Sequence, residues 1–208
     1  MAVESMLALM GFAFVTSITP GPSNLILLAA SANFGFWRSI PLVLGINLGF
    51  LSMLLIVGLG LGQVLRAHES LYTVLKILSL FYILWLAWKI ARSPPMKSAG
   101  DETGSRPLTF LQMAFLQWVN PKAWAVALTV TVAYTTPINY VASLLLMTLV
   151  FGIVNLPSVS AWAVFGSVLR NVLHDPVKVR AFNLLMAVLL VASMLPIVVD
   201  LTPPNQTP

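Results

Sequence analysis

The chain is built almost entirely from six apolar stretches, each close to the length that crosses a lipid bilayer. They are Met6–Ser31, Ile40–Val64, Leu71–Ala91, Phe110–Tyr134, Asn139–Val164 and Phe182–Val199. A helix needs about 20 apolar residues to span the hydrocarbon core. Because lipid offers no hydrogen-bond partners, a spanning segment of this kind must fold as a helix. The sequence therefore predicts an all-α membrane protein with six transmembrane helices.

The composition excludes a large soluble domain. The 208 residues are 59% hydrophobic and 8% charged, whereas soluble domains carry about 25% charged residues. The net charge of +5 comes with basic loops, which membrane orientation explains better than nucleic acid. There is no cysteine, hence no disulfide and no thiolate chemistry. We expect one polytopic membrane domain over residues 1–208, surrounded by the lipid bilayer, with no nucleic-acid partner and no cofactor.

Basic residues are distributed unequally between the two sides of the predicted bundle. Arg66 is in a loop on one side, whereas the three loops on the other side hold Arg38, Lys89, Arg92, Lys97, Arg106, Arg170, Lys178 and Arg180. The positive-inside rule puts these three loops in the cytoplasm. Six spans in the cell inner membrane then leave both termini periplasmic. Glu4 is the one charge before the first stretch, so that stretch reads as a retained helix rather than a signal peptide.

The two halves of the chain carry similar features. Pro20 interrupts the first stretch as Pro121 interrupts the fourth, and Asn47 in the second corresponds to Asn155 in the fifth. Three spans per half is an odd number, so the second half is inverted relative to the first. Inverted repeats with broken helices are typical of secondary transporters. The predicted fold is therefore two inverted three-helix repeats with broken helices one and four: repeat one 1–92, cytoplasmic linker 93–108, repeat two 109–200 and tail 201–208.

The first break is the run Thr19-Pro20-Gly21-Pro22 in the middle of the first stretch. We expect Thr19 to cap a half-helix that begins at Pro20, because proline is tolerated at the first helical position. Gly21 allows another backbone or a ligand to approach closely. The freed amides and the positive helix end would face a binding site. The alternative is a simple packing kink, since proline and glycine are common in membrane helices.

The second break is Asn120-Pro121-Lys122, with Asn120 as the expected cap and Pro121 as the first helical residue. Lys122 would lie about 15 Å from either end of its span, which is too deep for its ammonium to reach water fully. No aspartate or glutamate lies inside any predicted span. The centre should therefore be positive and uncompensated. It either binds an anion such as a substrate carboxylate, or Lys122 is neutral by desolvation.

Three asparagines could line the same site. Asn24 follows Pro20 by one helical turn, while Asn47 and Asn155 could contact substrate or bond helix to helix. Gly45 and Gly49 indicate close helix packing. No nucleophile–base pair, phosphate loop or metal-ligand spacing is present, so neither an enzyme nor a metal site is expected. The candidate substrate-binding residues are Thr19, Pro20, Gly21, Pro22, Asn24, Asn47, Asn120, Pro121, Lys122 and Asn155.

Both breaks lie in motifs that resemble those of the LysE/RhtB amino-acid exporters. The segments concerned are Ile18–Asn24, Leu44–Phe50 and Phe115–Trp124, and the resemblance extends over nearly the whole chain. Within the family, Tyr82–Ile90 is most similar to the cysteine/O-acetylserine exporter branch. The family often has asparagine or aspartate directly after the second proline, whereas this chain has Ser23.

The resemblance implies export of small neutral amino acids or derivatives, of the cysteine/O-acetylserine or threonine/homoserine type. It also implies use of the proton gradient, yet the spans lack the carboxylate or histidine that usually carries a proton. Coupling through Lys122 and uniport both remain open. Two other functions are alternatives: an aquaporin-like small-solute channel, and a membrane scaffold that transports nothing. The oligomeric state is also open, a homodimer included.

Overall fold

Helices form every regular element of the part of the chain that the structure describes. The computed structural model describes residues 3–67, 69–93, 108–136, 138–170, 173 and 175–193. The elements are α1 (Val3–Ile18), α2 (Pro22–Phe34), α3 (Phe36–Ile56), the π-helix η1 (Val57–Leu61), α4 (Gly62–Ala67), α5 (Glu69–Ala91), α6 (Phe110–Val119), α7 (Pro121–Tyr134), α8 (Tyr140–Arg170) and α9 (Pro176–Ala192). The prediction of an all-α chain is confirmed for these residues. The predicted tail, and the linker apart from its ends Ser93 and Leu108, lie outside them.

Length and composition identify two to three membrane spans among the described helices. Phe36–Val64 and Tyr140–Arg170 are each long and apolar enough to cross a bilayer. The helices α1 and α2 make a third candidate span when taken together, because they meet across a short break at 54°. The fourth apolar stretch is likewise divided into α6 and α7. The two breaks predicted from proline are therefore both present.

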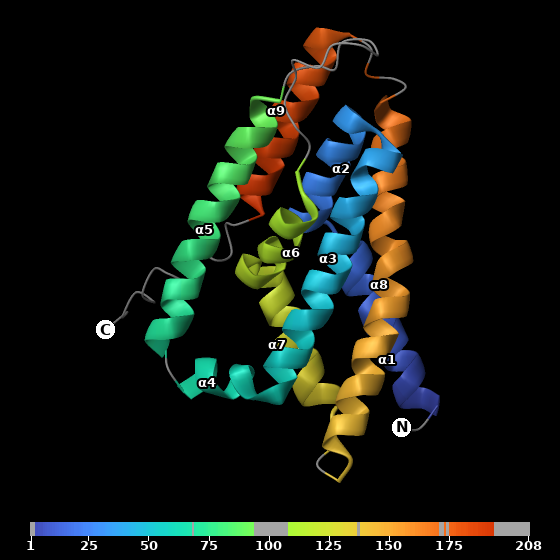
Figure 1. The fold of residues 1–208 in the computed structure, drawn as a ribbon, viewed down its shortest axis with the longest axis vertical. Coiled ribbons are helices and arrows are strands. Elements are labelled where there is room, and N and C mark those ends of the chain that lie inside the picture. Colours follow the sequence, from blue (N-terminus) through green and yellow to red (C-terminus); the bar gives the residue numbers. More distant parts are fainter. Residues whose placement is uncertain are drawn as a thin grey trace, which may run out of the picture.

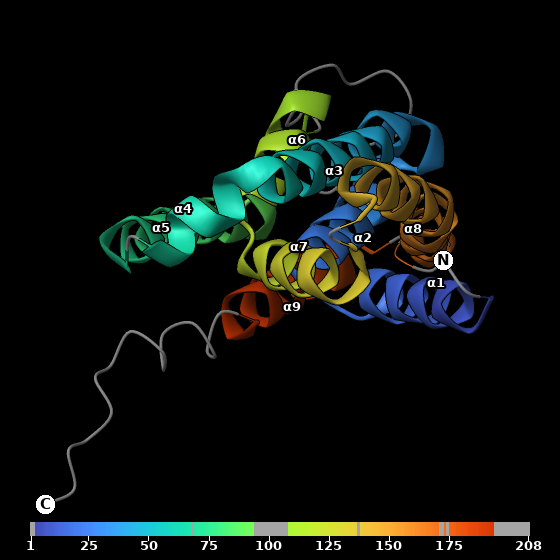
Figure 2. The same ribbon diagram turned by 90° about the horizontal axis from the view of Figure 1, so that it is seen from below.

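Most of the helices run along one long axis, as Figure 1 shows, while α4 lies across the lower end of the bundle. α3 packs against both α6 and α8, α2 packs against α8, and α5 packs against α9. Seen from below, α5 and α1 lie at opposite edges (Figure 2). The most extensive helix contacts thus join opposite halves of the sequence.

Basic residues gather at one end of this bundle. The beginning of α3, the ends of α5 and α8 and the beginning of α9 all lie at the upper end in Figure 1. These helix ends carry Arg38, Lys89, Arg170 and Lys178, and Arg92 directly follows α5. We call this the basic end. The loops that were expected to share one side of the membrane are therefore attached to one end of the molecule.

Two apolar clusters occupy different levels of the bundle. The upper core, towards the basic end, includes Leu27, Leu42, Leu86, Leu116 and Leu190. The lower core, towards the opposite end, includes Leu9, Met53, Ala127, Met147 and Phe151. Each cluster joins helices from both halves of the chain. The breaks between α1 and α2 and between α6 and α7 lie where one cluster gives way to the other.

Glycines let α3 approach α6 closely, as the sequence predicts. A Cβ on Gly45 would lie 2.5 Å from the carbonyl oxygen of Phe110, and one on Gly49 would lie 2.6 Å from the Cα of Ala114. Both neighbours are backbone atoms, which cannot swing aside. Further along, Gly60 has a φ of 131° inside η1, a conformation that other residues rarely adopt, and the chain kinks there between α3 and α4.

We expect Gly49→Ala to lower the free energy of unfolding by about 1–3 kcal/mol, because the new methyl group overpacks the α3–α6 contact. Thermal unfolding of the purified protein in detergent measures the effect. Gly11→Ala is the matched control, since nothing lies within 4 Å of a Cβ at that position. Equal stability of the two variants would contradict the packing of α3 on α6.

Candidate functional site

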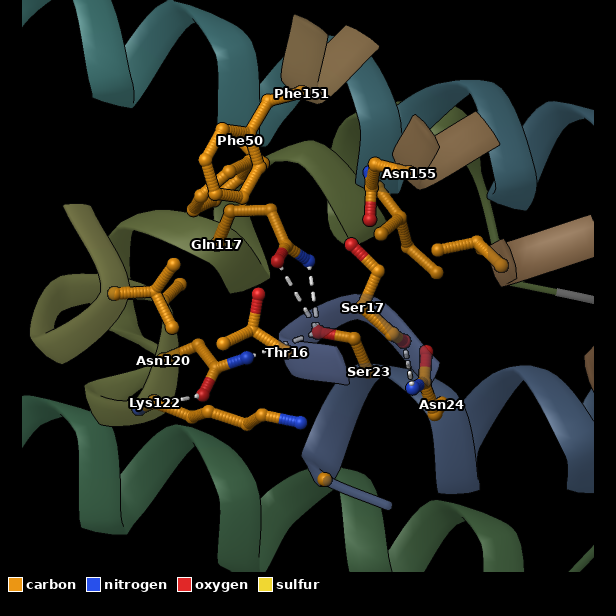
Figure 3. Close-up of a pocket in the computed structure, with 15 residues that line it drawn as sticks. Thr16, Ser17, Ser23, Asn24, Phe50, Gln117, Asn120, Lys122, Phe151 and Asn155 are labelled. Carbon is orange, nitrogen blue, oxygen red and sulfur yellow. Dashed lines mark hydrogen bonds between the residues drawn. The ribbon is translucent and has the colours of Figure 1, made fainter. Parts of the chain in front are cut away.

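The two breaks meet inside the bundle (Figure 3). The amide nitrogen Nδ2 of Asn120 donates to the hydroxyl oxygen of Ser23 over 3.0 Å, across 97 residues of sequence. Both side chains are buried, with 4% and 7% of their surface exposed. Ser23 belongs to the first turn of α2, and Asn120 precedes α7. The starts of these two half-helices are thus in contact.

The first break differs from the prediction. α1 ends at Ile18 and α2 begins at Pro22, with Gly21 as its N-cap, so the expected half-helix starting at Pro20 is wrong. Thr19 does not cap it either, because its hydroxyl donates back to the carbonyl oxygen of Val15. The reason lies in the second proline. A residue before proline is driven out of the α region, and Gly21 is accordingly extended, with φ −168° and ψ 175°.

Side chains from other helices satisfy the carbonyl groups that the break leaves free at the end of α1. Asn24 donates to the carbonyl oxygens of Ser17 at 2.8 Å and Thr19 at 3.0 Å. The indole nitrogen of Trp162 on α8 donates to that of Ile18 at 3.1 Å. A carbonyl without a partner is costly away from water. Asn24 therefore lines the site, as predicted, but its amide nitrogen is engaged in closing the end of α1.

Lys122 crosses from the second break to the first. Its ammonium donates to the carbonyl oxygen of Thr19 over 2.6 Å, at the negative end of α1. Its partner is thus a neutral carbonyl at a helix end, and no carboxylate lines the cavity beside it, as the sequence predicts. The lysine stem lies over Gly21, where a Cβ would come within 2.8 Å of its Cδ atom. Glycine at position 21 leaves the room that this arrangement needs.

The second break has the predicted form. Asn120 is the N-cap of α7 and Pro121 occupies its first turn. The carbonyl oxygen of the Asn120 side chain accepts from the backbone amide of Lys122 over 3.1 Å. The indole nitrogen of Trp124 donates to the carbonyl oxygen of Trp118 over 2.6 Å, which closes the end of α6. The start of α7 is thus capped, whereas α2 begins without any side-chain cap.

Gln117 is a member of the site that the sequence analysis missed. Its Nε2 donates to the Ser23 hydroxyl at 2.9 Å, and also to the carbonyl oxygen of Met113 at 3.2 Å. Only 3% of its surface is exposed. The signal was available in the sequence, because Gln117 is polar within an apolar helix and lies about one turn before Asn120.

Asn47 and Asn155 form a pair between α3 and α8. Nδ2 of Asn155 donates to Oδ1 of Asn47 over 2.9 Å, and both residues are buried. Asn155 also lines the cavity described next, whereas Asn47 is not among its lining residues. The sequence left two roles open for Asn47, contact with substrate or a hydrogen bond between helices. In the structure, Asn47 forms the hydrogen bond between helices.

A cavity lies beside the meeting point of the breaks. It has an empty volume of about 440 Å³, counting the part that is open to the outside. Of the predicted residues, Gly21, Asn24, Asn120, Lys122 and Asn155 line it. The predicted residues that are not among its lining residues are Thr19, Pro20, Pro22, Asn47 and Pro121. Residues not predicted that line it are Thr16, Ser17, Ser23, Ile46, Phe50, Gln117, Ala123, Val126, Phe151 and Val159.

The chemistry of this cavity is divided between two walls. One wall offers the Lys122 ammonium and the uncapped start of α2, whose first amides lack partners within the helix. The other is apolar, with the rings of Phe50 and Phe151 in contact, 5.5 Å between centroids. No carboxylate lines the cavity, and the described residues hold no cluster of potential metal ligands. The site therefore suits a small molecule with an anionic group.

Two comparisons with known proteins gave significant matches. A model of the LysE type translocator family matches residues 14–196. The chain is similar to the cysteine/O-acetylserine efflux protein of Salmonella paratyphi A, with 31% identity over 186 residues, covering 86% of this chain and 90% of that protein. The protein of the same name from Escherichia coli K12 is 30% identical over 188 residues, with the same coverage. No solved structure gives a significant match. The matched region contains both breaks and the whole site, so this chain belongs to the LysE type translocator family and is a membrane transport protein, not an enzyme.

Proposed function

We propose that this protein exports small neutral amino acids or their derivatives, and that the cavity between the breaks binds them. The observation that carries the proposal is the Lys122 ammonium beside the uncapped start of α2, in a cavity without a carboxylate. Amides at a helix start and a neighbouring ammonium together favour a carboxylate. The names of the relatives, which are cysteine/O-acetylserine efflux proteins, support this substrate class.

The substrate carboxylate would bind between Lys122 and the first amides of α2. An ammonium has three donors, and the Thr19 carbonyl takes one of them. The side chains of Asn155 and Gln117, which line the same cavity, carry carbonyl oxygens that can accept from the substrate ammonium. The substrate side chain would lie towards Phe50 and Phe151. This assignment moves Asn24 and Asn47 from substrate recognition to support of the helices.

In the membrane, we propose that the chain forms a single domain of six spans in two inverted repeats. The direction of the helices supports this: α1 and α2 run towards the basic end, and α6 and α7 run away from it (Figure 1). Packing of α3 on α8 and of α5 on α9 pairs corresponding helices of the two halves. The basic end would face the cytoplasm by the positive-inside rule, with both termini periplasmic. Transport would alternate the cavity between the two sides.

We assign any coupling to protons to Lys122. The described carboxylates are at helix ends, with Glu4 in the first turn of α1, Glu69 at the start of α5 and Asp175 capping α9. None of them lines the cavity. Lys122 is thus the ionisable side chain in contact with the proposed substrate position, and uniport is the alternative if it keeps its proton.

Lys122→Met should lower the rate of export about 10- to 100-fold, because a charged hydrogen bond to the carboxylate is lost. The measurement is efflux of O-acetylserine, cysteine, threonine or homoserine from proteoliposomes. Lys178→Met is the matched control, since Lys178 is exposed in the first turns of α9. If Lys122→Met exports at the wild-type rate, the proposal that Lys122 binds the substrate carboxylate is contradicted. Fast osmotic swelling without amino-acid efflux would instead identify a channel.

Gly21→Ala should weaken export through Lys122, because the added methyl would lie 2.8 Å from the lysine Cδ and displace the ammonium. The decisive comparison is a double-mutant cycle. In the Lys122→Met background, Gly21→Ala should cost little further activity. Gly11→Ala, which meets no neighbour within 4 Å, controls for a general glycine effect. Equal losses in both backgrounds would show that Gly21 acts independently of Lys122.

A further inference from the structure

A second cavity lies between α2 and the end of α5, at the basic end of the bundle. Its empty volume is about 340 Å³, counting the open part. Three polar residues line it, Asn33, Lys89 and Ser93, and its other lining residues are apolar, among them Ile26 and Leu86. An ammonium, a carboxamide and an apolar wall are also the components of the first cavity. The two sites therefore suit the same kind of molecule.

Lys89 is the charged group of this second cavity. Its ammonium lies 5.4 Å from the centre of the Trp85 ring, and the side chain is half-buried. It forms no ion pair with any carboxylate of the described residues. Arg92, one turn later, lies over Trp88 instead, at 4.8 Å, and is not among the lining residues. A carboxylate entering this cavity would thus meet Lys89 and not Arg92.

A buried asparagine pair holds α2 in place beside the second cavity. Asn33 on α2 donates to Oδ1 of Asn183 on α9 over 2.7 Å, and Asn183 donates back over 3.2 Å. Asn183 also donates to the carbonyl oxygen of Ser93, after α5, over 3.1 Å. Asn183 is fully buried and Asn33 is 5% exposed. Hydrogen bonds therefore join α2 to α9, and α9 to the segment after α5, at this point.

The helix α2 connects the two cavities. Its first residues, at Ser23 and Asn24, line the first cavity, and Asn33 near its end lines the second. Asn33 follows Asn24 by nine positions, a distance of about 14 Å along the axis. Ile26, which is fully buried and belongs to the upper core, lies between these levels. A solute moving along α2 from the basic end to the first cavity would have to displace the apolar side chains of the upper core at Ile26.

We infer that the second cavity is an outer binding site for the same amino-acid substrates, with Lys89 receiving the carboxylate and buried Ile26 separating this site from the first cavity. This inference rests on the proposed function. It adds a recognition step at the basic end that the first cavity does not supply.

Protection of a single thiol tests the inference directly. The chain has no cysteine, so Ser93→Cys introduces the one reactive thiol into the second cavity. Ser167→Cys is the matched control, because Ser167 is on α8 one turn before Arg170 and lines neither cavity. Both serine hydroxyls donate to a carbonyl of their own segment, so the substitutions are equivalent. The reagent is a membrane-impermeant methanethiosulfonate, applied to vesicles of each orientation.

O-acetylserine should slow labelling of Ser93→Cys from the basic end about tenfold, at ten times its half-protecting concentration. Labelling of Ser167→Cys should not change. The same protection should persist when Lys122→Met is combined with Ser93→Cys, because the second site is separate from the first. Loss of protection in that combination, or none at all in the single variant, would overturn the inference.

Transport kinetics give a second, independent measurement. Lys89→Gln should raise the KM for O-acetylserine supplied at the basic end about tenfold, with the maximal rate kept, while Arg92→Gln stays near wild type. Equal kinetics for both variants would overturn the role of Lys89. If wild-type vesicles transport no amino acid at all, the proposed function itself fails. Normal wild-type flux without protection or a Lys89 effect refutes the outer site alone.

Discussion

The structure depends on one requirement: a helix that breaks inside a membrane must find partners for the backbone groups it releases. Here, residues at each break form hydrogen bonds with backbone or side-chain groups at the other break or at the same break. Lys122 from the second break binds the Thr19 carbonyl of the first, and Asn120 binds the Ser23 hydroxyl. Asn24 and Trp124 close the helix ends beside them. The breaks are therefore a mutually stabilised unit, which fixes how the two halves of the chain meet.

The two breaks are not equivalent, and the difference makes a site. Asn120 caps α7 with its own side chain, whereas α2 starts at Gly21 with no side-chain cap. The amides at the start of α2 thus have no side-chain cap, and Lys122 lies beside them. The proposed carboxylate site depends on this difference, because two capped helix starts would leave no free amides. The same helix reaches the second cavity near its other end, so α2 is the element on which both proposals depend.

The helical class and the two breaks were predictable from local chemistry. Apolar composition indicated helices, prolines located both breaks, and the Asn120-Pro121 pair specified the start of α7. The error at Thr19 came from weighing Pro20 without the effect of Pro22 on Gly21, which is itself a local rule. Gln117 was not singled out, although it is a polar residue inside the Phe115–Trp124 motif, because its partner is not a neighbour in the sequence. Its role depends on Ser23, a residue 94 positions earlier in the chain.

The sequence by itself determined that the chain is helical and apolar, that two of its helices break near their centres, and that a lysine lies at one break. These are properties of single segments, set by transfer of side chains into lipid and by the geometry of proline. The tertiary structure decided what the lysine contacts, which asparagines line the cavity and which join helices. Hydrogen bonds such as those of Lys122 with Thr19 or Asn155 with Asn47 link residues about a hundred positions apart. Their geometry depends on how whole helices pack, which no local pattern encodes.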